Sequence, residues 1–314
     1  MIELKNVKKS YGANIAVNDI SLKINKGEIV GLLGPNGAGK STTMKMLCGY
    51  LVPEDGIIEI DSKNLKENMQ SSKQKIGYMP ENNPLYKDMR VGDAIDFAMD
   101  LKDIPIEKRK EMMDRVIKAT GLQDVFFKQI SELSKGYKQR VGIAQVLAGD
   151  PDILVLDEPT EGLDPNQRSE IRTLIKELGK DKTVIISTHV MQEVEAMCTR
   201  IILINKGRVI ADGDKDSIIK GKNKDALIKL RIKSNSDPKP EVSKIEGVKN
   251  INTIKVEGDI RNMEVTVKDA NKFFEEFNTK LKTSSWVIFE IQQKQENLEE
   301  VFRELTMDSA PIKN

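Results

Sequence analysis

The fold is decided by the stretch Gly34-Pro35-Asn36-Gly37-Ala38-Gly39-Lys40-Ser41, which Thr42 follows. A β-rich run, Glu28–Leu33, precedes it, and a segment of helical character, Lys40–Tyr50, continues it. This is the phosphate-loop pattern in its expected context between a strand and a helix. The glycines let backbone amides curl toward a phosphate chain, and the helix start adds a partial positive charge. We expect residues 34–42 to bind nucleotide phosphates, with Lys40 at the β- and γ-phosphates and the Ser41 hydroxyl on Mg²⁺.

A later strand carries two acids at its end. The apolar run Asp152–Leu156 is followed by Asp157 and Glu158. Beside a phosphate loop, such a pair predicts nucleotide hydrolysis, with Asp157 binding Mg²⁺ through water and Glu158 acting as base for the attacking water. Without the loop, the same pattern would be equally typical of a strand that ends on two solvated acids.

Residues 1–220 are predicted to form one α/β domain with a parallel core and an antiparallel edge. The continuous apolar runs Asp152–Leu156 and Thr183–Ser187 are typical of parallel strands that are buried on both faces. Antiparallel strands are expected at Ile2–Val7, Ile15–Ile24, Ile201–Ile204 and Arg208–Ala211. The last two flank the turn signal Asn205-Lys206-Gly207 and so predict a hairpin.

A helical insertion is expected between the early and late strands. Within Lys66–Thr120, the segments Asp93–Asp100 and Lys108–Ala119 place apolar residues at intervals of three and four. We assign this insertion to about residues 66–150.

A second, smaller domain is expected over residues 225–305, followed by a tail at 306–314. The pattern of the first domain is interrupted at Gly221-Lys222-Asn223-Lys224. Strands are predicted at Ala226–Lys233, Ile251–Val256, Met263–Val267 and Trp286–Gln292, and helices at Pro240–Ile245, Ala270–Leu281 and Leu298–Leu305. The order strand, helix, strand, strand, helix, strand predicts a ferredoxin-like α+β domain.

Composition excludes several classes of function. The net charge of +1 gives no electrostatic pull toward nucleic acid, so we expect no nucleic-acid partner. The chain has no run of about 18 apolar residues that would span a bilayer, and its first residues do not resemble a secretion signal. A single histidine, His189, excludes a zinc site built from two imidazoles.

The segment Leu133-Ser134-Lys135-Gly136-Tyr137-Lys138-Gln139-Arg140 resembles the signature of the ATP-binding cassette (ABC) family, which reads Leu-Ser-Gly-Gly-Gln. Lys135 and Tyr137 depart from that form, whereas Ser134 and Gly136, which the family places on a γ-phosphate, are kept. Physically, a serine hydroxyl and free amides at a helix start favour an anion. Taken alone, Ser134 would more often be only a helix N-cap.

Further positions carry implications of the same resemblance. Tyr11 would stack on adenine and Val17 would support that pocket, while Gly162-Leu163-Asp164 would pass between partner subunits. His189 would contact the γ-phosphate and help to position the attacking water. Glu81 stands where the family has a glutamine that ligates Mg²⁺, and a carboxylate there adds negative charge near the phosphates.

The resemblance implies an ATPase subunit of an ABC transporter, using ATP and Mg²⁺. Two cassettes, either two copies of this chain or this chain and a related one, would close head to tail around two nucleotides. A polytopic permease would dock near residues 81–91, at the cytoplasmic face of the membrane. The runs Pro80-Glu81-Asn82-Asn83-Pro84-Leu85-Tyr86 and Asn297-Leu298-Glu299-Glu300-Val301-Phe302 resemble the bacterial exporter branch, which includes gliding-motility and multidrug ATPases. The alternatives are a soluble ABC ATPase that acts on ribosomes or DNA, and a regulator without transport.

Overall fold

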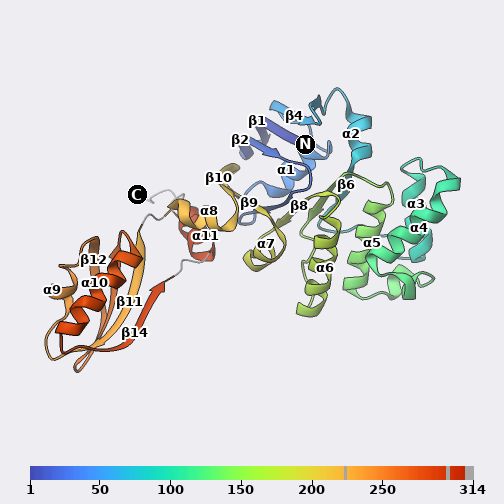
Figure 1. The fold of residues 1–314 in the computed structure, drawn as a ribbon. Helices are drawn as coiled ribbons and strands as arrows, with labels where there is room; N and C mark the ends of the chain where they lie inside the picture. The colour runs from blue at the N-terminus through green and yellow to red at the C-terminus, as the bar shows by residue number, and fades with distance from the viewer. Residues whose placement is uncertain (223–224, 295–297, 308–314) are drawn as a thin grey trace. The chain divides into compact units, whose positions relative to one another are not determined.

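The structure is a computed structural model that describes residues 1–222, 225–294 and 298–307. The chain divides into two compact units, Met1–Lys215 and Asp216–Asn314 (Figure 1). This division falls a few residues before the expected boundary at residue 220, and helix α8 (Lys215–Lys222) begins at it. Within the described ranges, no helix has the length and apolar character needed to cross a membrane.

The first unit opens with an antiparallel sheet. Its strands are β1 (Ile2–Tyr11), β2 (Asn14–Ile24), β4 (Asp55–Ile60) and β5 (Lys63–Asn64), in the order β2-β1-β4-β5. Ile20, Leu22 and Ile24 are buried and alternate with exposed residues, so one face of β2 packs on the core. The antiparallel strands expected near the N-terminus are confirmed.

A second sheet forms the parallel core. Its strands are β3 (Ile29–Leu33), β6 (Ile76–Met79), β7 (Ile153–Asp157), β8 (Thr183–Thr188), β9 (Arg200–Asn205) and β10 (Arg208–Gly213), in the order β10-β9-β3-β8-β7-β6. Every residue of β3, β7 and β8 is buried, and the continuous apolar runs of β7 and β8 predicted this for those two strands. The strands pair in parallel except for the antiparallel hairpin β9–β10.

The core sheet separates two hydrophobic cores. Because successive side chains of a strand point to opposite faces, β7 gives Leu154 and Leu156 to one core and Ile153 and Val155 to the other. The first core lies against the helices that follow β6, and the second lies between the two sheets.

The register brings three loops to one edge of the core sheet. Leu33 at the end of β3 is paired with Thr188 of β8, and Asp157 at the end of β7 is paired with Ser187. The loops that leave β3, β7 and β8 therefore start side by side. Parallel α/β sheets usually carry their ligand sites at this carboxyl edge.

The helices of the first unit are α1 (Lys40–Leu47), α2 (Met69–Lys75), α3 (Val91–Asp100), α4 (Ile106–Thr120), α5 (Lys135–Leu147), α6 (Pro165–Leu178) and α7 (Met191–Met197). Two 3₁₀ turns lie at Gln123–Val125 and Ile130–Glu132. Helices α3, α4 and α5 lie together as a lobe (Figure 1).

The expected extent of the helical insertion, about residues 66–150, is corrected by β6. This strand lies inside that range and pairs with β7 as a member of the core sheet. The helical lobe therefore begins after Met79. Four residues of strand are too short for periodicity to separate them from neighbouring helical patterns.

The second unit contains β11 (Ala226–Lys233), α9 (Lys239–Val242), β12 (Val248–Glu257), β13 (Ile260–Val267), α10 (Ala270–Thr283), β14 (Val287–Lys294) and α11 (Leu298–Met307). Its antiparallel sheet has the order β12-β13-β11-β14. This is the ferredoxin-like arrangement predicted from the order of elements. Of the expected tail, residues 308–314 lie outside the described part of the chain.

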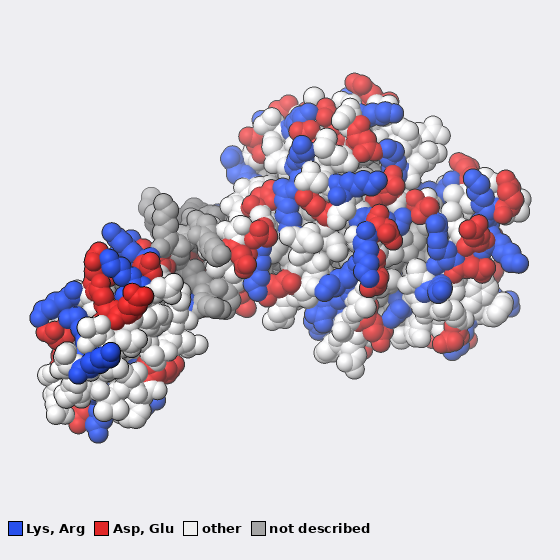
Figure 2. All heavy atoms as spheres, in the orientation of Figure 1, with Lys and Arg blue, Asp and Glu red and all other residues white. Residues whose placement is uncertain are grey.

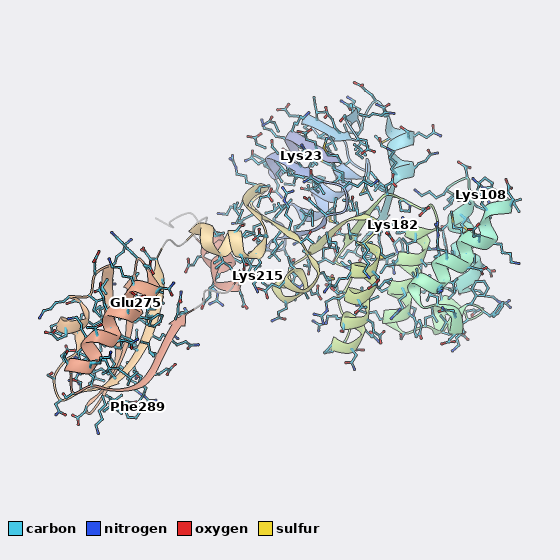
Figure 3. All side chains as sticks on the ribbon, in the orientation of Figure 1. Lys23, Lys108, Lys182, Lys215, Glu275 and Phe289 are labelled. Atoms are coloured by element: carbon cyan, nitrogen blue, oxygen red, sulfur yellow. The ribbon has the colours of Figure 1, made fainter. Side chains whose placement is uncertain are left out.

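The core of this unit is mainly aliphatic, and an aromatic cluster lies within it. Phe273 and Phe277 on α10 are almost fully buried, and their rings stack with centroids 5.5 Å apart, while Trp286 packs on Phe277 at 6.0 Å. Asp269 caps α10 by accepting from the amides of the first turn, a contribution of about 1 kcal/mol. Figure 3 labels Glu275 on α10 and Phe289 on β14. Phe289 lies outside this core and is 56% exposed.

Charge is spread evenly over the face of the molecule shown in Figure 2. Lysine and arginine side chains are interspersed with aspartate and glutamate, and no broad area of one sign stands out on that face.

Candidate functional site

The loop between β3 and α1 is held tightly against neighbouring strands. A Cβ atom at Gly34 would lie 2.2 Å from the backbone oxygen of Ile204, and one at Gly39 would lie 2.3 Å from that of Ala16. Gly39 also has φ of 106°, a backbone that residues with a side chain rarely adopt. No side chain caps the start of α1, so its first amides point into the loop without a side-chain acceptor.

Lys40 lies inside this loop and is 6% exposed. Its ammonium group donates hydrogen bonds to the backbone oxygens of Gly34 at 2.8 Å and Pro35 at 3.3 Å. Burial lowers the pKa of Lys40, and the negative charges of Glu158, Asp157 and Glu81 oppose that shift. The ammonium group is thus a buried cation that lies near these three carboxylates.

Two serine hydroxyls converge on Asp157. Ser41 Oγ at the start of α1 donates to Asp157 Oδ1 at 3.2 Å, and Ser187 Oγ of β8 donates to the same oxygen. Asp157 is 2% exposed and Ser187 is fully buried. The carboxylate is therefore fixed by hydroxyl groups from two elements that are far apart in the sequence.

Glu158 and His189 form a pair at the end of β7 and β8. His189 Nδ1 lies 3.1 Å and 3.2 Å from the two carboxylate oxygens of Glu158. Glu158 is 7% exposed and burial raises its pKa, while the contact with His189 opposes the shift. Its φ of 49° is left-handed, a conformation that costs energy in a residue with a side chain. The Glu158 amide donates to Ser187 at the backbone oxygen and at Oγ, which holds that conformation.

Of these groups, Lys40, Ser41, Glu158 and His189 line a cleft of about 410 Å³, a volume within the range of small-molecule sites. Its lining contains Tyr11, Asn14, Ala16, Asn36, Gly37, Ala38, Gly39, Lys40, Ser41, Thr42, Glu81, Glu158, Glu161 and His189. The structure thus brings the predicted phosphate loop, the predicted base and the predicted histidine together. Tyr11 stands at the cleft with half of its side chain exposed.

Val17 does not line the cleft itself. It is fully buried in the core between the two sheets, and its support of the pocket beside Tyr11 stays a prediction. Its neighbour Ala16 lines the cleft instead, because adjacent residues of a strand face opposite sides.

Six other predicted residues are not among those that line this cleft. Gly34 and Pro35 accept hydrogen bonds from the buried Lys40, and Asp157 accepts from Ser41.

The remaining three lie elsewhere. Ser134 is the N-cap of α5 and accepts from the Tyr137 amide at 3.4 Å, and Asp164 is the N-cap of α6 and accepts from the Gln167 amide at 2.9 Å. Gly136 is buried against Gln167, where a Cβ atom would lie 2.9 Å from its side chain. These residues form a second cluster at the starts of two neighbouring helices.

Comparison with known proteins follows this geometry. A family model described as "ABC transporter" matches residues 17–161. Linearmycin resistance ATP-binding protein LnrL of Bacillus subtilis is 30% identical over 307 residues, which is 98% of each chain. The chain belongs to the ABC transporter ATP-binding proteins.

The cassette is also similar to a relative with a longer chain and to a solved cassette. Probable multidrug ABC transporter ATP-binding protein YbhF of Escherichia coli is 39% identical over 219 residues, 69% of this chain but only 38% of that protein. A dimeric ATP-binding cassette in a post-hydrolysis state, bound to ADP and Pi, superposes with a TM-score of 0.62 at 28% identity. That match covers 68% of this chain and 98% of the other, so the first unit shares the fold of an ABC cassette. The solved cassette holds ADP and Pi, the products of ATP hydrolysis.

The residues of the cassette fit Mg²⁺ only in part by themselves. In the described ranges, no group of three or more His, Cys, Asp or Glu residues is placed to hold a metal ion. Ser41 and Asp157 supply hard oxygen donors, and Mg²⁺ commonly takes one or two such ligands together with nucleotide phosphates and water. Glu81 is exposed at the cleft, where it places a second carboxylate besides that of Asp157.

Sequence reasoning missed several residues of the ABC cassette site. Ser187 was treated as the end of an apolar strand, although a serine in a buried position needs a hydrogen-bond partner. Asn14, Ala16 and Glu161 also line the cleft. The available signals in the sequence were the glycine that follows Tyr11, which indicates a turn, and an acid three residues after Glu158.

Proposed function

We propose that this chain binds and hydrolyses MgATP as the nucleotide-binding subunit of an ABC exporter. The observation that carries the proposal is the meeting, in one cleft, of the glycine loop, the buried Lys40, and the pair Glu158–His189. A polyphosphate needs the first two, and water attack needs the third.

Binding would begin at the two ends of the cleft. The exposed ring of Tyr11 offers a flat surface for adenine, and the loop amides with Lys40 face the phosphates. Ser41 and Asp157 would hold Mg²⁺, which supplies charge neutralisation at the phosphates when bound.

Glu158 would take a proton from the attacking water. Burial raises its pKa and so makes the carboxylate a stronger base than a solvated one. His189 approaches through Nδ1, which leaves its other ring nitrogen for the γ-phosphate or the water.

The test of this role is Glu158→Gln, which keeps the size of the side chain and removes the base. We expect ATP to bind, hydrolysis to fall by about 10²–10⁴-fold, and an ATP-bound dimer to accumulate in light scattering. Glu177→Gln, on the exposed end of α6, is the control and keeps the full rate. Full hydrolysis by Glu158→Gln would discredit the assigned base.

A complete site would need two cassettes. Ser134, Gly136 and Asp164 gather apart from the cleft lining of their own chain, which suits contact with a nucleotide held by a second cassette. The dimeric form of the solved cassette that binds ADP and Pi supports this arrangement. The second cassette is proposed to be another copy of this chain or a relative.

Mixing two inactive variants tests the shared site. Lys40→Ala lacks a working phosphate loop and Ser134→Ala lacks the signature hydroxyl, so each homodimer is impaired in both sites. A mixed dimer has one intact site, formed by the loop of one chain and the signature of the other. We expect mixing to restore hydrolysis, whereas no gain on mixing contradicts a homodimer with shared sites.

The permease would dock in a larger groove of about 750 Å³ beside the helical lobe. Tyr50, Tyr86 and Leu101 line it with more than half of each side chain exposed. Large apolar and aromatic side chains that are exposed together in a groove favour contact with a protein partner. The groove includes Asn83 and Pro84, from the region expected to contact the permease.

The exporter assignment and the membrane location rest on names of relatives. LnrL is named for resistance and YbhF for multidrug transport. Gentle extraction of the chain from membranes should copurify a polytopic protein, at the cytoplasmic face. Copurification with ribosomes or DNA would favour the alternative class of soluble ABC ATPase, and an absence of hydrolysis would favour a regulator.

A further inference from the structure

A buried carboxylate outside the cleft connects the two loops that carry Glu158 and His189. Glu193 lies in the first turn of α7 and is 3% exposed. Its Oε2 atom accepts hydrogen bonds from Thr160 Oγ1 at 2.5 Å and from Thr188 Oγ1 at 3.0 Å. Both threonines are also buried, with exposures of 2% and 0%.

The two threonines flank the groups proposed to act on water. Thr160 follows Glu158 by two residues, and Thr188 immediately precedes His189. One oxygen atom of Glu193 is thus bonded to both loops. Among the hydrogen bonds of the described residues, Glu193 is the one partner that the side chains of Thr160 and Thr188 share.

The hydroxyl of Thr188 also fixes the far side of His189. It accepts from the Val190 amide at 3.0 Å while it donates to Glu193. The residues before and after the histidine therefore belong to one chain of hydrogen bonds, which runs from the Val190 amide through Thr188 to Glu193. Consecutive hydrogen bonds of this kind strengthen one another in a buried site.

Packing alone does not hold the imidazole. The His189 side chain is 46% exposed, and among the described residues its side-chain hydrogen bonds go only to Glu158. Its place relative to Glu158 must then come from the backbone that carries it. That backbone is held by Thr188, and the backbone of Glu158 is held by Ser187 and, through Thr160, by Glu193.

We propose that Glu193 is a positioning residue that fixes Glu158 and His189 at their mutual distance of about 3.1 Å for water attack on ATP. The inference rests on the proposed function. Glu193 acts through Thr160 and Thr188 and touches neither nucleotide nor water itself. A carboxylate suits this task because a single oxygen can accept from two hydroxyl donors.

The experiment removes the hydroxyls without changing shape. Thr160→Val and Thr188→Val are isosteric, and we expect each to lower kcat on the order of tenfold, because small misplacements of reacting groups carry penalties of that size or larger. KM for ATP and the affinity for a fluorescent ATP analogue should stay within about twofold of the unmodified chain, since these threonines do not line the cleft. Thr160→Ser, which keeps a hydroxyl, should recover most of the lost rate.

Two further variants complete the test. Glu193→Gln keeps an acceptor oxygen and should retain more activity than Glu193→Ala. The matched control is Thr120→Val, which removes another fully buried threonine hydroxyl. Among the residues that the structure describes, this hydroxyl bonds only within α4, so the variant should hydrolyse ATP at the normal rate.

The outcomes separate positioning from simple stability. A lower kcat with unchanged KM and rescue by Thr160→Ser supports the proposal. A normal kcat in both valine variants overturns it, and so does a parallel fall of kcat, nucleotide affinity and melting temperature, which would indicate a structural role only. Hydrolysis by the unmodified chain is measured alongside: its absence overturns the proposed function and this inference together, whereas unaltered variants overturn only the part played by Glu193.

Discussion

Replacing Ser187 by alanine removes the hydroxyl that contacts both Asp157 and the backbone of Glu158. Ser187 Oγ donates to Asp157 Oδ1 and accepts from the Glu158 amide at 3.0 Å. The residue is fully buried, so water will not replace the lost group. Alanine fits the space because it is smaller by one oxygen atom.

The magnitude follows from these two bonds. A hydrogen bond to a charged group contributes about 1.5–3 kcal/mol, and Asp157 would keep Ser41 as a donor at 3.2 Å. The Glu158 amide keeps the backbone oxygen of Ser187 at 3.2 Å, so its loss is small. We expect a decrease of about 2–3 kcal/mol in the free energy of unfolding of the cassette. For a unit of this length, that corresponds to a fall of about 5–10 °C in Tm.

Circular dichroism during heating, with calorimetry as a second probe, measures this change on the full chain. Ser41→Ala is the matched control, because it removes the other hydroxyl donor to the same oxygen from a site that is only partly buried. We expect it to cost about 1 kcal/mol or less. A Ser187→Ala protein that melts within about 2 °C of the unmodified chain would refute the reasoning.

Three further predictions concern the loop, the ring and the buried acid. Gly39→Ala should abolish nucleotide binding in a fluorescence titration, since its Cβ would lie 2.3 Å from the oxygen of Ala16, and Gly37→Ala, with open space around it, should be milder; equal effects would contradict the steric argument. Tyr11→Ala should weaken ATP affinity by about tenfold and Tyr11→Phe should not, as measured by calorimetric titration, if the ring stacks on the base. Glu158→Gln should raise Tm more at pH 8 than at pH 4. Burial raises the folded-state pKa of Glu158, so the folded chain binds this proton more tightly and loses stability as pH rises from the ordinary carboxyl pKa through the raised value. A Tm difference that does not depend on pH would contradict the raised pKa.

The sequence was sufficient where function needs consecutive residues. The loop from Gly34 to Ser41, and Asp157 with Glu158, each form an unbroken motif next to a strand. A continuous apolar run identifies such a strand without knowledge of its neighbours. His189 was predicted from the resemblance to the ABC family, and it comes directly after a buried strand.

Positions that depend on register were harder to predict. Val17 and Ala16 differ by one residue, and the pairing of β1 with β2 contains three register shifts, so which of the two faces the cleft does not follow from alternation alone. Ser187 depends on its pairing with Asp157 across two parallel strands. Glu193 reaches its threonines only after α7 folds back on the sheet, and spacing along the chain carries no sign of it.

The chain contains one histidine and one tryptophan, and they lie in different units. His189 touches Glu158, so its imidazole protons give a single NMR resonance pair that reports directly on the hydrolytic centre. Trp286 packs against Phe277, so intrinsic fluorescence excited at the red edge reports only on the accessory unit. The response of each of the two units to added nucleotide can thus be followed in the same molecule without attaching any label.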